Sequence, residues 1–187
     1  MNWGTIVLTI LGSGSLSAFV SYFLNRRFNN KKLNAEIVSK SRIDWINEFR
    51  SIASDYLYEG YKSIEEGKLF CEFEKLMNNS KPYSNSKSRY KKKSEYHAKK
   101  YNETVNNMTK YFIQIRLYLP DRPDGSSQEE HKKIKDEIKA LGNKLNNAMG
   151  NRDKKYFNQI QKVDMQFLAD YIAEYLKKEW DKAKDKK

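Results

Sequence analysis

An uncharged segment near the N-terminus, Trp3 to Leu24, constrains this chain more than any other feature, because the rest of the sequence is crowded with lysine. A helix of this length, rising about 1.5 Å per residue, would cross a hydrocarbon core of about 30 Å. The segment therefore predicts one transmembrane helix within residues 1–25. The remainder then divides into a basic helical region at 26–184 and a charged tail at 185–187.

The flanks of this segment favour a retained anchor over a cleaved signal peptide. A secretory signal begins with a positively charged region, but no Lys or Arg precedes the segment. Basic residues follow it instead, and the positive-inside rule then places the N-terminus outside and the long C-terminal part in the cytoplasm. The first of them are candidate contacts to the anionic inner leaflet: Arg26, Arg27, Lys31 and Lys32.

Small hydroxyl side chains recur at steps of four through the segment: Thr5, Thr9, Ser13, Ser17 and Ser21. Residues of this kind allow helices to approach closely in lipid and to hydrogen-bond across the contact. The stripe fits a contact between helices, and it equally fits the lining of a narrow pore. A third interpretation is simple tolerance, because such hydroxyls can bond to their own helix backbone.

Charge and cysteine content limit the classes of partner and site. The chain of 187 residues has a formal net charge of +12, all of it outside the first 25 residues, so the basic region should associate with phosphates, nucleic acid or lipid headgroups. Cys71 is the only cysteine, which excludes an intramolecular disulfide and a cysteine-based zinc site.

Helical periodicity and the scarcity of proline predict an all-α fold, a bundle of about four helices after the anchor. The expected helices run from about Arg27 to Met77, from Tyr90 to Leu119, from a capping box at Ser127 and Glu130 to Gly150, and from Arg152 to Lys184. Turn residues predict loops at Asn78–Ser88 and Leu119–Ser127. Gly60 and Gly67 are points where the first helix is expected to bend or break.

Apolar residues at helical spacing predict the core-facing side of each helix. In the first helix the stripe includes Leu33, Ile37, Ile43, Ile46, Ala53, Leu57 and Ile64, widened by Trp45, Phe49, Ile52 and Tyr56. The second contributes Met108, Phe112, Ile115 and Leu119, and the third Ile134, Ile138, Leu141 and Leu145. The last contributes Phe157, Ile160, Val163, Phe167, Leu168, Tyr171, Ile172 and Leu176.

Enzyme signatures are absent from the sequence. His97 and His131 are the only histidines, and neither belongs to a metalloprotease, nucleophile-elbow or phosphate-loop motif. Glu129, Glu130 and His131 lie in the first turn of a predicted helix, where acidic side chains favour the helix dipole. No catalytic residue, cofactor site or metal site is therefore predicted.

One basic stretch combines cations with aromatic rings, as a nucleotide-binding or single-strand-binding surface requires. Its candidate residues are Arg89, Lys91, Lys92, Lys93, Tyr96, Lys99, Lys100 and Tyr101. The same composition is typical of a solvated face in a basic protein, and it also suits contact with the anionic inner leaflet. These three interpretations stay open at the level of sequence.

Three short stretches carry a resemblance to known proteins: SRIDWINEFR (Ser41–Arg50), IRLYLPD (Ile115–Asp121) and EEHKKIKDEI (Glu129–Ile138). With one span followed by a helical bundle, this layout resembles small single-pass bacterial membrane proteins. It is similar to the channel subunit of Hailong-type anti-phage defence systems, in which a nucleotidyltransferase partner makes an oligonucleotide that controls an oligomeric channel. The resemblance implies a bacterial inner-membrane location, with the hydroxyl stripe as pore and the basic stretch as ligand surface. It carries over no catalytic residue.

Two functional hypotheses follow. The first is a homo-oligomeric membrane effector that conducts ions and is controlled by a nucleotide or a partner at its cytoplasmic domain. The second is a membrane-anchored adaptor without a channel, whose basic helical domain holds a nucleic acid or a protein at the inner leaflet.

Overall fold

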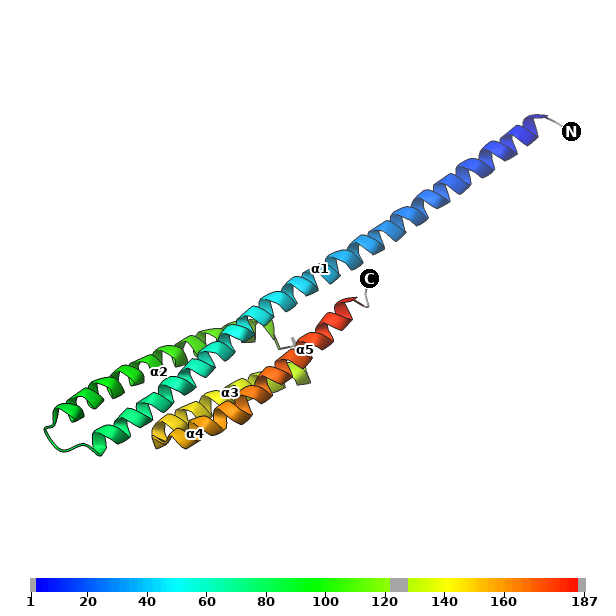
Figure 1. Cartoon of the computed structure of the whole chain (residues 1–187). Helices are drawn as coiled ribbons and strands as arrows, with labels where there is room; N and C mark the ends of the chain where they lie inside the picture. The colour runs from blue at the N-terminus through cyan, green and yellow to red at the C-terminus, as the bar shows by residue number, and fades with distance from the viewer. Residues whose placement is uncertain (1–2, 122–127, 185–187) are drawn as a thin grey trace. The chain divides into compact units, whose positions relative to one another are not determined.

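The computed structural model describes residues 3–121 and 128–184, with side chains from Asn25 onward apart from those of 27, 28, 30 and 31. All secondary-structure elements of these residues are helices (Figure 1). They are α1 (Trp3–Asn78), α2 (Asn85–Tyr118), α3 (Glu129–Asn151) and a C-terminal helix made of α4 (Lys154–Gln159), a π-helical segment η1 (Ile160–Met165) and α5 (Gln166–Lys184). The prediction of an all-α chain with about four helices is confirmed.

The chain divides into two compact units. One contains the chain up to Asp44 together with residues from Trp180 onward, and the other is Trp45–Glu179. In the first unit, the Ser39 hydroxyl donates to the carbonyl oxygen of Ala183 at 2.9 Å. Leu33 and Ile37 of this unit are 54% and 58% exposed, so their predicted place in the core is wrong. Periodicity predicts a continuous apolar face, but it does not predict that another helix covers that face.

The unit Trp45–Glu179 is a helical bundle. Its part of α1 runs antiparallel to α2, because Glu48 accepts a hydrogen bond from Tyr118 at 2.6 Å while Phe73 stacks on Tyr90. The third helix joins them through the Tyr56 hydroxyl, which donates to the Ile138 carbonyl at 3.4 Å. Most of the predicted core residues of this unit are buried, among them Ile46, Phe49, Ile64, Met108, Ile115, Ile134, Leu141, Leu145, Leu168 and Ile172.

Two glycines allow the C-terminal helix to pack closely on α1. A Cβ atom on Gly67 would overlap the ring of Phe157, and one on Gly60 would lie 3.0 Å from Cε of Met165. The helix runs through both positions without interruption. The prediction that the first helix breaks at these glycines is therefore wrong, and both glycines instead make room for side chains of the C-terminal helix.

The π-helical segment changes which side of the last helix faces the core. A π turn contains one more residue than an α turn, and the buried residues accordingly step by five from Ile160 to Met165. Val163 and Phe167 were predicted in the core, but they are 58% and 46% exposed. The prediction failed because it applied a constant α-helical period across this segment.

The other helices begin and end within a few residues of their predicted bounds. The second helix begins at Asn85, earlier than the predicted Tyr90, because the Ser84 hydroxyl accepts from the backbone N–H of Lys87 at 3.2 Å. The third begins at Glu129 after Gln128, while Ser127 of the predicted capping box lies outside the described residues. The third helix ends at Asn151, one residue after the predicted Gly150, and Arg152 follows in the left-handed conformation.

Candidate functional site

The predicted basic residues lie in the N-terminal half of α2, all within helix. Residues three and four apart share one face of a helix, and this places Arg89, Lys92, Lys93, Tyr96, Lys99 and Lys100 together. Lys91 belongs to a different face, where its Nζ lies 3.9 Å from a carboxylate oxygen of Glu95. The basic surface of α2 is defined here as those six residues, and Lys91 is not part of it.

Tyr101 does not belong to this surface either. Its side chain is only 3% exposed and packs edge-to-face on Phe157, with ring centroids 6.1 Å apart. Burial raises the pKa of its hydroxyl to about 12, and this hydroxyl has no hydrogen-bond partner among the described residues. Tyr101 is a core residue, so its predicted role in ligand stacking is wrong.

Two cations of the basic surface already interact with neighbouring side chains. The ammonium of Lys93 lies 4.8 Å from the ring centroid of Phe73, a cation–π contact. Lys100 donates to Glu103 at 2.8 Å, and this hydrogen bond raises the pKa of Lys100 and lowers that of Glu103. Both partners therefore stay charged near neutral pH, and the pair adds little net charge to the surface.

The other three cations, Arg89, Lys92 and Lys99, form no ion pair with any residue that the structure describes. At about 1.5 Å per residue, they occupy about 15 Å of one helix face. Tyr96 lies among them with 57% of its surface exposed. Its ring meets that of His97 edge-on at 5.1 Å, nearly perpendicular at 82°. Among the described residues, the surface thus offers a row of three cations without ion-pair partners, beside an exposed tyrosine ring.

Behind this row, His97 is fixed between α1 and α2. Its Nδ1 lies 2.7 Å from a carboxylate oxygen of Glu66, and its ring stacks on Phe73 at 5.3 Å with an interplanar angle of 7°. Sequence reasoning missed Glu66 and Phe73, since both lie on α1, far along the chain from the basic stretch. These contacts hold α2 against α1 at His97.

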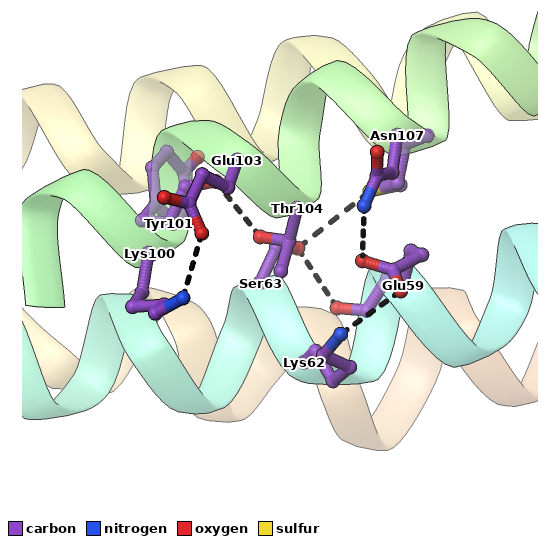
Figure 2. A network of polar contacts seen from close by, with 10 residues as sticks. Glu59, Lys62, Ser63, Lys100, Tyr101, Glu103, Thr104 and Asn107 are labelled. Atoms are coloured by element: carbon purple, nitrogen blue, oxygen red, sulfur yellow. Dashed lines mark hydrogen bonds and ion pairs between the residues drawn. The ribbon is translucent and has the colours of Figure 1, made fainter.

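A polar network continues along the same interface (Figure 2). The buried carboxylate of Glu59 accepts from Lys62 at 2.9 Å and from Asn107 at 3.3 Å. The hydrogen bond from Lys62 to Glu59 raises the pKa of Lys62. The hydroxyls of Ser63 and Thr104 each donate to a backbone carbonyl of their own helix, at 2.9 and 2.8 Å. Polar groups buried with their partners fix the register of α2 on α1.

His131 was interpreted as part of a helix start, and it lies in the first turn of α3 with Glu129 and Glu130. Its side chain is buried, its Nε2 lies 2.8 Å from the Tyr175 hydroxyl, and burial lowers the pKa of the imidazole. Tyr175 also packs edge-on against Trp45 and Phe49. His131 therefore belongs to an aromatic part of the core.

The proposed membrane residues are described only in part. The side chains of Thr5, Thr9, Ser13, Ser17 and Ser21 lie outside the described ones, as do those of Arg27 and Lys31. Arg26 and Lys32 are exposed. Among the residues whose side chains the structure describes, no helix has a stretch long and apolar enough to cross a membrane.

Comparison with known proteins gives no match: no family model, no curated protein and no solved structure is similar to this chain.

Proposed function

We propose that this chain is a homo-oligomeric, single-pass effector of the bacterial inner membrane that is not itself an enzyme. Its apolar segment, Trp3–Leu24, forms an ion-conducting pore together with the segments of other copies. Its helical domain binds an anionic nucleotide or oligonucleotide, made by a nucleotidyltransferase partner during anti-phage defence, and this ligand controls the pore.

The observation that carries the proposal is the row of Arg89, Lys92 and Lys99 beside exposed Tyr96. Cations that lack carboxylate partners remain available to phosphates, and an exposed ring remains available to a base. Three phosphate contacts on a single strand predict that the logarithm of the binding constant falls with the logarithm of salt concentration with a slope of about −2.

The pore half of the proposal is supported by sequence and by helix continuity. The segment is uncharged over a length sufficient to span a bilayer, and it keeps small hydroxyl residues at a constant step. The same helix, α1, contains both this segment and Glu66 and Phe73, which contact the ligand-facing helix. A ligand that changes the packing of α2 on α1 would therefore act on the helix that enters the membrane.

The test is conductance of the purified full-length chain in planar bilayers, together with its mass in detergent by light scattering. We expect an oligomer that conducts, and a smaller conductance when Ser13 and Ser17 are both replaced by leucine. Leucine at Ala18 and Val20 is the matched control. A monomer with silent bilayers would overturn the proposal.

The second candidate function is an adaptor that holds an anionic partner at the membrane without conducting, and the unpaired cations of α2 support it equally. The same preparation separates the two functions. Salt-dependent binding of an oligonucleotide with no conductance under any ligand condition favours the adaptor, whereas conductance that responds to the oligonucleotide favours the effector.

A further inference from the structure

A pocket of about 190 Å³ lies between α1, α2 and α3. Its lining is mostly apolar and includes Tyr56, Val105, Met108, Phe112, Ile138 and Leu145. An apolar protein cavity of about 150 Å³ is large enough to hold benzene. The pocket therefore has room for one aromatic ring or an apolar group of similar size, but it is smaller than a typical site for a drug-sized ligand.

Gly142 lines this pocket and has no packing reason to be glycine. A Cβ atom at this position would meet nothing within 4 Å, in contrast to Gly60 and Gly67, where it would meet Met165 and Phe157. The residue lies inside α3 without a left-handed backbone conformation. Alanine would favour the helix more. A methyl group fits here without contact, whereas a large side chain at this position would extend into the pocket.

One side of the pocket is polar and positively charged. Lys139, Asn143 and Asn146 lie at steps of four and three along α3, next to Gly142, and all three line the pocket. Among the described residues, these three side chains form no hydrogen bond or ion pair. A ligand that carries an anionic group could therefore pair with the ammonium of Lys139 and accept hydrogen bonds from the two amides.

We propose that this pocket binds a small molecule made of one aromatic ring, or an apolar group of similar size, that carries a carboxylate or a similar anionic group. The apolar part occupies the space among Met108, Phe112 and Ile138, and the anionic part lies against Lys139. The site is separate from the basic surface of α2 and does not depend on the function proposed above.

The test uses the full-length chain in nanodiscs with methyl-labelled isoleucine, leucine and methionine, titrated with benzoate and with benzene. We expect both probes to shift the NMR signals of the Met108, Ile138 and Leu145 methyls and to leave those of Ile64 and Leu168 unchanged. Lys139→Gln should weaken benzoate binding at least fivefold and leave benzene binding unchanged.

Two variants fill the pocket from opposite walls, Gly142→Leu on α3 and Val105→Phe on α2. Each should abolish the shifts, while Gly142→Ala, the matched control, should retain them. The proposal is overturned if millimolar benzoate and benzene leave the three methyls unshifted, if the shifts spread evenly over the bundle, or if a filled and folded variant binds as tightly as the original chain.

Discussion

The ring of Phe157 packs directly on the backbone of Gly67, in the space that the side chain of any larger residue would occupy. Gly142, in another helix, has open space at the same place. Adding one methyl group should therefore have opposite effects at the two sites. Gly67→Ala should destabilise the chain by about 1–3 kcal/mol through overpacking. Gly142→Ala should stabilise it by up to about 1 kcal/mol through helix propensity.

Urea unfolding of both variants measures the difference, and each variant is the control for the other because the chemical change is identical. Equal free energies of unfolding for the two variants would show that Phe157 does not lie against Gly67 in solution.

The π-helical segment makes a second prediction, about chain length. Deleting exposed Val163 should convert this segment into regular α-helix and keep the residues from Met165 onward facing the core. Deleting exposed Ala173 from regular helix should rotate Tyr175, Leu176 and Glu179 by about 100° away from their buried positions. We expect the chain lacking Val163 to unfold at a higher temperature than the chain lacking Ala173, as measured by circular dichroism. The reverse order would argue against the π segment.

The buried imidazole of His131 predicts a pH dependence of stability. Burial lowers its pKa below the usual 6.5, so the unfolded chain takes up this proton at a higher pH than the folded chain. Well above pH 6.5 the group is neutral in both states and contributes nothing. As the pH falls below that value, the free energy of unfolding should decrease, by at most about 1.4 kcal/mol per pH unit for one proton.

Urea unfolding midpoints between pH 8 and pH 5 measure this effect, and His131→Gln provides the comparison. Other titrating groups are common to both chains, so the difference between the two pH profiles isolates the imidazole. Superimposable profiles would mean that His131 is solvated in solution.

The basic surface of α2 predicts which lysines matter for an anionic ligand. Replacing Lys92 and Lys99 together by glutamate should lower the affinity for a fluorescent single-stranded oligonucleotide by more than tenfold. The slope of affinity against salt concentration should become shallower, from about −2 to about −0.7 or closer to zero. The control is the double variant Lys132→Glu and Lys177→Glu, on α3 and α5, which changes the net charge by the same amount. Similar losses in both double variants would indicate an unspecific charge effect.

Tyr96 should contribute through stacking and not through charge. Tyr96→Ala is expected to weaken oligonucleotide binding by about 1–3 kcal/mol without changing the salt slope, and Tyr96→Phe should keep the original affinity. Tyr101→Phe should have no effect on binding, since that ring is buried. Fluorescence anisotropy at several salt concentrations measures all three variants. If anionic vesicles bind and the oligonucleotide does not, the ligand is a lipid headgroup.

Much of the fold was predictable because α3 keeps a regular period. Ile134, Ile138, Leu141 and Leu145 recur at steps of three and four, and all are buried. The place of Tyr101 in the core could also have been found, since Tyr101, Met108 and Ile115 are spaced by seven residues and all three are buried. Tyr101 was instead assigned to ligand stacking because it follows the basic stretch.

Other features were not predictable from sequence periodicity. The π segment breaks the period itself, so no constant step reveals Met165 as a core residue. The pairing of His97 with Glu66 depends on how α2 aligns with α1, which is fixed by the turn at residues 79–84 and by contacts such as Asn107 to Glu59. Local sequence patterns do not predict how two distant helices align.

Cys71 lies on α1 with its thiol buried, and burial raises its pKa to about 11. Alkylating reagents react with the thiolate, so this residue should stay almost unmodified at neutral pH while the chain is folded. Because it is the only cysteine, a second one introduced at an exposed position such as Lys92 would be the only rapidly labelled site. Spin labels and fluorophores can therefore be attached without first mutating the native thiol. The slow reaction of Cys71 itself with maleimide measures how often local unfolding exposes this part of α1.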